Sequence, residues 1–138
     1  MSGVRESQAR YQRHPSAVKA ARFRAAELTE EWGLQPHADD VQLILSEVLT
    51  NAVRHGAGRQ VAVSYHLDAA RLRVEVRDQG DAIPCPRSAD GEAEDGRGLM
   101  IVQGLASRWG VNDRVIGKAV WFEIDVPPVP ATNEPSAT

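Results

Sequence analysis

The feature that most constrains the fold is a change in the spacing of apolar residues near the middle of the chain. Between residues 41 and 52 they recur at three- and four-residue steps, which predicts an amphipathic helix of roughly five turns. These residues are Val41, Ile44, Leu45, Val48, Leu49 and Ala52. Over 61–67 and 71–77 the larger apolar residues instead occupy every second position. Two alternating segments with a short connection predict a β-hairpin that has one buried and one polar face.

Helix-breaking residues mark out a further helix before this one. Pro15 and Ser16 favour a helix start and Gly33 favours a stop, so a first helix is predicted from about Ser16 to Trp32. The helix that follows it is expected to end at two glycines, Gly56 and Gly58. Pro36 lies near its first turn with Asp39 and Asp40 close behind, and acidic side chains suit the positive end of a helix dipole.

The second half of the chain begins with an aperiodic stretch. Residues 79–97 are rich in Pro, Gly and acidic residues, which is typical of a binding loop or lid. A third helix is predicted from Leu99 to about Ser107, and two closing strands are predicted over 110–116 and 119–126.

These elements predict one folded unit with short flanking segments. We assign residues 1–14 to an arm or edge strand, residues 15–126 to the domain, and residues 127–138 to a disordered tail. Helices grouped on one face of a mostly antiparallel mixed sheet predict a two-layer α/β sandwich of the α+β class.

Composition excludes several classes of function. The chain of 138 residues carries a net charge of −3, which disfavours nucleic acid as a direct partner. It contains no apolar run long enough for a signal peptide or a membrane span, so we expect a soluble, cytoplasmic protein without a membrane partner. Its single cysteine, Cys85, cannot build an internal disulfide framework or a multi-thiolate metal site.

A polar stripe borders the apolar face of the second helix. Glu47, Asn51 and His55 follow one another at four-residue steps and therefore share one side of the helix. An asparagine amide oxygen suits Mg²⁺, and a glutamate can order a water or accept a proton. A solvated helix edge with intrahelical hydrogen bonds explains the same spacing.

Two glycine motifs follow in the second half of the chain. Asp78 ends the second hairpin strand and Gly80 follows it, so the carboxylate can accept a hydrogen bond from an exocyclic amine such as that of adenine. Gly96, Arg97 and Gly98 precede a predicted helix, where backbone N–H groups favour phosphate. Taken alone, the motif at Asp78 and Gly80 is explained by a plain turn, and the motif at Gly96 and Gly98 by a glycine hinge.

The order of these motifs resembles that of the GHKL, or Bergerat-fold, ATPases. The matching stretches are SEVLTNAVRH (46–55), VEVRDQGDAIP (74–84), GRGLMIVQGLASRWGV (96–111) and GKAVWFEI (117–124). The resemblance covers about residues 15–126. Within this superfamily the chain is most similar to the anti-sigma factor serine kinases and related stand-alone ATP-binding regulators.

The resemblance implies a role for each motif residue. Asn51 corresponds to the Mg²⁺ ligand, Glu47 to the catalytic acidic residue, Asp78 to the adenine-reading aspartate and Gly80 to its neighbouring glycine. The other residues expected to contact the ATP are His55, Gly96, Arg97, Gly98, Leu99 and Lys118. Two departures are expected to weaken nucleotide binding. Ala82 stands where many relatives have a second glycine, and Ala119 stands where many have a hydroxyl residue that supports the aspartate.

The function implied by the resemblance is transfer of the γ-phosphoryl group of Mg-ATP to a serine or threonine of an anti-anti-sigma-type partner. The alternative is a non-catalytic, nucleotide-dependent module that sequesters a sigma factor or another regulator. Relatives in this branch often form homodimers, so the resemblance also implies a homodimer.

Overall fold

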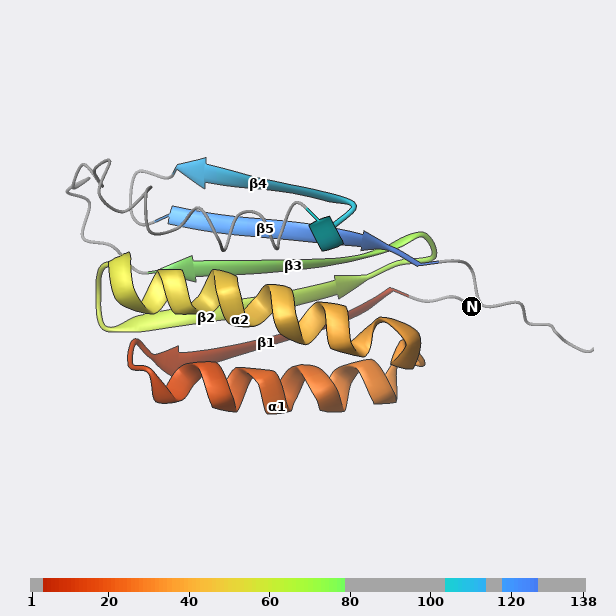
Figure 1. Ribbon diagram of the computed structural model, residues 1–138, viewed down its shortest axis with the longest axis horizontal. Helices are drawn as coiled ribbons and strands as arrows, with labels where there is room; N and C mark the ends of the chain where they lie inside the picture. Colours follow the sequence, from red (N-terminus) through yellow and green to blue (C-terminus); the bar gives the residue numbers. More distant parts are fainter. Residues whose placement is uncertain (1–3, 79–103, 114–117, 127–138) are drawn as a thin grey trace, which may run out of the picture.

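The computed structural model describes residues 4–78, 104–113 and 118–126. Five strands form one sheet in the order β1-β2-β3-β5-β4, and the described neighbours all pair antiparallel. Two helices lie on one face of this sheet, α1 beside β1 and α2 across the middle strands (Figure 1). The elements are β1 Arg5–Gln12, α1 Ser16–Glu31, η1 Gln35–His37, α2 Ala38–His55, β2 Gln60–Leu67, β3 Arg71–Asp78, β4 Arg108–Asp113 and β5 Lys118–Asp125.

The core lies between the two helices and the inner face of the sheet. Every second residue of β2, β3 and β5 points into it, and α2 contributes the apolar stripe that its spacing predicts. The largest fully buried side chains are Phe122, Ile44, Leu45, Leu49, Leu72, Val41, Val61, Val63, Val74 and Val76. The α+β sandwich is therefore confirmed, and so is the hairpin, in which Leu67 of β2 faces Leu72 of β3.

The first half of the chain agrees closely with the predicted elements. Helix α1 ends at Glu31, one residue before the predicted end, and α2 begins at Ala38 after the short 3₁₀ turn that contains Pro36. Of the two alternatives for the N-terminal residues, the chain adopts the edge strand, because β1 pairs with β2 along its whole length.

The second half of the chain agrees with the predicted elements only in part. The first closing strand, predicted over 110–116, begins two residues earlier at Arg108, and its part beyond Asp113 lies outside the described residues. Of the third helix, predicted to about Ser107, residues 104–107 are described. Gly104 and Leu105 are helical, whereas Ala106 and Ser107 are not, because the chain turns there to enter β4 at Arg108. The predicted loop over 79–97 and the predicted tail over 127–138 also lie outside the described ranges. No helix in the described part of the chain is long and apolar enough to cross a membrane.

Candidate functional site

Helix α2 carries the three polar residues that the sequence singles out. Glu47, Asn51 and His55 are each half-buried, along the border between the buried stripe and solvent. Glu47 and His55 lie about 12 Å apart along the helix axis, at the usual rise of 1.5 Å per residue. The structure thus places a carboxylate, an amide and an imidazole in one row that ends where α2 ends.

Asp78 closes β3 on the face that is covered by the helices. Its side chain is 5% exposed. The backbone N–H of Lys118, the first residue of β5, donates a hydrogen bond of 3.2 Å to its Oδ1 atom. This bond orients the carboxylate of Asp78 at the end of the strand.

Gly56 brings the end of α2 against this carboxylate. A Cβ atom at Gly56 would lie 2.3 Å from the carbonyl oxygen of Ala52 and 3.0 Å from Oδ2 of Asp78. A residue with a side chain therefore does not fit here unless the helix end and Asp78 move apart. The sequence analysis predicts Gly56 only as the residue that ends the helix. It does not predict the close approach of Gly56 to Asp78.

Arg13, which lies between β1 and α1, was missed as well. Its Nε and Nη1 atoms donate hydrogen bonds of 2.7 Å and 2.6 Å to the carbonyl oxygens of Gly58 and Val53. These carbonyls belong to the end of α2 and to the connection that follows it, so the guanidinium satisfies acceptors that the helix itself leaves open. Its positive charge also suits the negative end of the helix dipole. No local sequence pattern signals a contact over 45 residues.

The end of α2, the end of β3 and the beginning of β5 come together at one end of the molecule (Figure 1). Of the predicted site residues, the structure therefore brings Asp78 and the backbone of Lys118 into contact, next to the helix that carries Glu47, Asn51 and His55. The other predicted site residues, Gly80, Gly96, Arg97, Gly98 and Leu99, lie outside the described residues.

The expectation that a hydroxyl residue at position 119 would support Asp78 is wrong. In the β3–β5 pairing Ala119 stands opposite Arg77, one position before Asp78. Because side chains alternate along a strand, residue 119 points to the opposite face of the sheet from Asp78. A hydroxyl there would not support the aspartate, whereas the backbone N–H of Lys118 does.

The donor set fits a cation that arrives with a nucleotide. Within the described ranges no group of three or more His, Cys, Asp or Glu side chains gathers to hold a metal ion. Asn51 offers one amide oxygen. Mg²⁺ usually takes one or two protein oxygens and completes its octahedron with substrate phosphates and water. The single amide oxygen of Asn51 is compatible with such a cation, and its role as the Mg²⁺ ligand stays a prediction.

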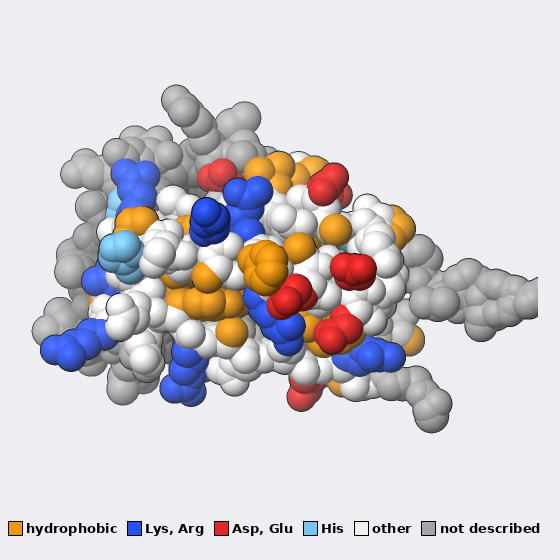
Figure 2. All heavy atoms as spheres, turned by 90° about the horizontal axis from the view of Figure 1, so that it is seen from below, with side chains coloured by type: hydrophobic (Ala, Val, Ile, Leu, Met, Phe, Trp, Pro, Cys, Tyr) orange, Lys and Arg blue, Asp and Glu red, His pale blue; other side chains and the backbone are white. Residues whose placement is uncertain are grey.

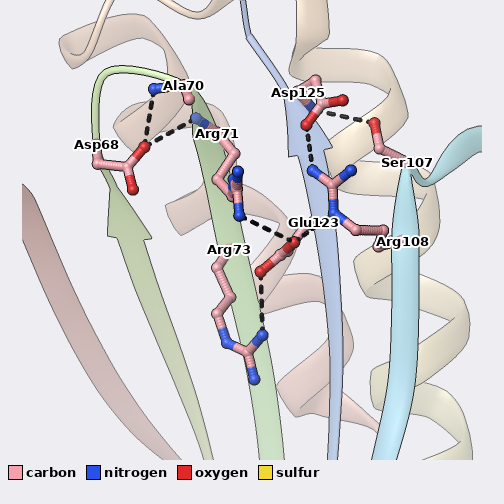
Figure 3. A network of polar contacts seen from close by, with 8 residues as sticks. All are labelled: Asp68, Ala70, Arg71, Arg73, Ser107, Arg108, Glu123 and Asp125. Carbon is pink, nitrogen blue, oxygen red and sulfur yellow. Dashed lines mark hydrogen bonds and ion pairs between the residues drawn. The ribbon is translucent and has the colours of Figure 1, made fainter.

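A second polar cluster occupies the open face of the sheet, around Glu123 (Figure 3). Glu123 accepts hydrogen bonds of 2.7 Å from Nε of Arg108 and 3.1 Å from Nη1 of Arg73, and Arg108 also pairs with Asp125. Burial raises the pKa of Glu123, but the bonds from the two arginines and the charge of Arg71 outweigh it, so this pKa lies below its usual value.

This open-face cluster is separate from the candidate site. Arg73 and Asp78 lie about 16 Å apart along β3 at the usual rise per residue, and they point to opposite faces of the sheet. The guanidinium of Arg73 also stacks 4.2 Å from the ring centre of Trp121. Glu123 and its arginines therefore tie three strands together and take no part in the site at Asp78.

The family of the chain follows from comparison with known proteins. The five-stranded sheet with helices packed on one face is consistent with the fold of ATPase domains. The model of the histidine kinase-like ATPase domain matches residues 11–124, so the chain belongs to this family. Membership confirms the ATPase superfamily and implies that the domain binds ATP. No curated protein matches the chain closely enough to narrow this further.

Proposed function

We propose that this chain is a regulatory protein kinase of the anti-sigma factor type. It would bind Mg-ATP beside the C-terminal half of α2 and phosphorylate a serine or threonine of a separate anti-anti-sigma-type protein. The observation that supports this most directly is the buried carboxylate of Asp78, oriented by the N–H of Lys118 and pressed against Gly56. Such a carboxylate accepts a hydrogen bond from an exocyclic amine, which favours adenine.

The row of residues on α2 supports the transfer step. Asn51 would hold Mg²⁺, which supplies positive charge to the phosphates when it is bound. Glu47, one helical turn further from Asp78, would accept the proton of the attacking hydroxyl. As the new oxygen–phosphorus bond forms, the bond from the γ-phosphorus to the bridging oxygen breaks, and ADP leaves with that electron pair.

Nucleotide binding is tested first, by calorimetric titration with Mg-ATP. Asp78→Asn is expected to weaken binding about tenfold or more, because the amide replaces one acceptor oxygen by an NH₂ donor and removes the negative charge that strengthens the hydrogen bond from the adenine amine. The control is Glu75→Gln, which alters a carboxyl group on the same strand but on the open face of the sheet. Equal affinity of the wild type and Asp78→Asn would remove Asp78 from the site.

Phosphoryl transfer is tested separately, with radiolabelled ATP and candidate anti-anti-sigma proteins. Glu47→Gln is expected to abolish the transfer and to leave ATP binding intact, whereas Glu31→Gln on the exposed side of α1 changes neither. If the wild type binds ATP and labels no partner, the kinase proposal fails. That result would favour the second candidate, a nucleotide-dependent module that sequesters a sigma factor or another regulator.

A further inference from the structure

Strand β2 carries small side chains on the face of the sheet that the helices leave open. The large apolar residues of this strand point into the core, so Ala62 and Ser64, which lie between them, point to the open face. The strands on either side carry longer side chains next to these two positions. Small residues between two rows of larger ones form the floor of a groove, which we call the β2 groove.

The register of the sheet places the walls of the β2 groove. Arg10 of β1 and Arg77 of β3 stand opposite Ala62, one on each side, and Glu75 of β3 stands opposite Ser64. Neighbouring strands lie about 4.8 Å apart, so the Cα atoms of the two arginines are about 10 Å apart. Among the described residues neither arginine forms a hydrogen bond or an ion pair. Two long side chains at this distance can hold one carboxylate between them, above the alanine.

The β2 groove deepens beside this pair of arginines. A hollow of about 340 Å³ is lined there by Ser64, His66, Arg73 and Glu75. His66 closes the far end, where its Nδ1 atom lies 2.9 Å from Oε2 of Glu6 on β1. The register places His66 between Glu6 and Arg73, so the imidazole separates this carboxylate from the arginine. The hollow therefore has one positive wall residue, Arg73, and one negative wall residue, Glu75.

Arg73 is held in position by its own chain. Its guanidinium lies 4.2 Å from the ring centre of Trp121, and its Nη1 atom donates a hydrogen bond of 3.1 Å to Glu123 (Figure 3). The ring in turn lies close over Gly110, where a Cβ atom would be 2.7 Å from Cζ2 of Trp121. A guanidinium has five N–H donors, so the bond to Glu123 leaves others for a partner. An arginine fixed in this way loses little conformational entropy on binding.

The charges along β3 alternate on the open face. Arg77, Glu75 and Arg73 follow one another at steps of about 6.7 Å, twice the rise of a strand. The side chains on one face of an extended peptide repeat at the same step. Acidic, basic and acidic residues at alternate positions of such a peptide are therefore complementary to β3. A nucleic acid is negative along its whole length and would be repelled by Glu75.

We propose that the β2 groove binds an extended segment of a partner protein with acidic, basic and acidic side chains at alternate positions. The first acid lies between Arg10 and Arg77, the base enters the hollow beside Glu75, and the second acid meets Arg73. Glu75 also takes part in another interaction, and a carboxylate can accept several hydrogen bonds at once. The groove and Asp78 are on opposite faces of the sheet, so the inference goes beyond the kinase function and does not rest on it.

The wider distribution of charge favours one orientation of this partner. On the side of the molecule that carries α1, most basic side chains lie toward the end where α2 ends, and most acidic ones lie toward the other end (Figure 2). Arg77, next to the last residue of β3, belongs to the more basic end. An acidic partner is therefore steered toward the arginine pair first. Because the contacts are exposed ion pairs, we expect binding to weaken with salt.

The test is a titration of the ¹⁵N-labelled full chain, followed by NMR. The probe is a disulfide-closed β-hairpin peptide with glutamate, lysine and glutamate at alternate positions of one strand, which presents them already extended. We expect a dissociation constant of about 1 mM or lower. The signals of Ser64 and Glu75 should shift, and that of Asn51 on α2 should not. Mg-ATP should leave this affinity unchanged, so the result does not depend on whether the kinase proposal holds.

Charge reversal separates the β2 groove from general attraction between charges. The double variant Arg10→Glu with Arg77→Glu should bind the probe about tenfold more weakly or less. It should prefer a second probe, in which lysine replaces one of the two glutamates. The matched control is Lys19→Glu with Arg22→Glu, the same change of charge on exposed positions of α1, which should bind the first probe as the wild type does. Circular dichroism checks that both double variants are folded.

A third probe tests the spacing. It has the same composition, but its three charged residues are consecutive and point to alternate faces, so it should bind about tenfold more weakly than the first. The proposal is wrong if the first probe causes no shifts at about 5 mM, or if the third binds equally well. It is also wrong if the arginine double variant keeps the wild-type affinity, or if a second copy of the chain already fills the groove and excludes the probe.

Discussion

The two helices lie side by side on the same sheet, yet their sequences follow opposite rules. Helix α2 has Asp39 and Asp40 in its first turn and Arg54 and His55 in its last, an order that suits its dipole. Helix α1 has the reverse order, with Lys19 near its start and Glu30 and Glu31 at its end, and it exposes Phe23. The charges of α2 are explained by the fold and by the site at its end. Those of α1 oppose its dipole, so we expect packing of its buried face, and not its charges, to stabilise this helix.

The largest expected contrast is between two apolar truncations. Leu49 of α2 is fully buried, so Leu49→Ala should lower the free energy of unfolding by about 2–5 kcal/mol. Phe23→Ala removes a larger side chain from α1. It should change the free energy of unfolding by less than about 0.5 kcal/mol, because the ring is already mostly exposed to water. Urea denaturation at low protein concentration measures both. A large loss for Phe23→Ala would mean that α1 packs differently from the structure described here.

A second contrast concerns the glycines that follow each helix. Gly56 after α2 has ordinary backbone angles and no room for a Cβ atom, whereas Gly33 after α1 has a φ of 74° and open space around it. Gly56→Ala should therefore cost about 2–3 kcal/mol through displacement of the helix end, and it should also weaken ATP binding. Gly33→Ala should cost about 1–2 kcal/mol through backbone strain and leave ATP binding unchanged. Thermal melts with and without Mg-ATP separate the two effects.

A smaller loss is expected at the C-terminal end of α2. Arg13→Ala removes two hydrogen bonds to carbonyl oxygens at this end and should lower the free energy of unfolding by about 1–3 kcal/mol. Arg13→Lys should restore only part of the lost free energy of unfolding, since an ammonium group cannot bridge the two carbonyls with the same planar geometry. Denaturant midpoints of the three proteins provide the comparison. Full recovery with lysine would show that charge alone matters there.

The smallest effect has the opposite sign. Lys19→Glu places a negative charge in the first turn of α1 and should raise the stability of the monomer by about 0.3–1 kcal/mol. Melting curves of the wild type and Lys19→Glu at low protein concentration measure this change. Destabilisation of the monomer would contradict our account of the charge order in α1.

Sequence patterns predict the elements of this fold better than they predict how the site is assembled. The apolar stripe of α2 and the alternation in β2 and β3 arise from burial on one face, which local spacing records directly. The hydrogen bond from Lys118 to Asp78 joins residues 40 positions apart and depends on the register of β3 against β5. A shift of one residue moves a side chain to the other face, and this is why the expectation for Ala119 was wrong.

The residues of the candidate site also fall into two groups, those that local sequence patterns identify and those that they do not. Asp78 and the row on α2 are identified by residue type and spacing, which reflect the chemistry of nucleotide binding. Gly56 and Arg13 act through close approach and long-range hydrogen bonds, and neither leaves a local pattern. Residues that join distant segments at a site are therefore identified only from the three-dimensional structure, in which those segments pack together.

The order of strands also bears on how the chain folds. The β2–β3 hairpin closes through a connection in which Asp68 accepts a hydrogen bond from Arg71, three residues away, whereas Glu6 on β1 meets His66 on β2 across 60 residues. Contacts between distant residues form slowly because loop closure precedes them. During synthesis β1 emerges before β2 and cannot pair with it until β2 is complete. The hairpin and α2 are therefore expected to form the folding nucleus, and β1 to join the sheet last.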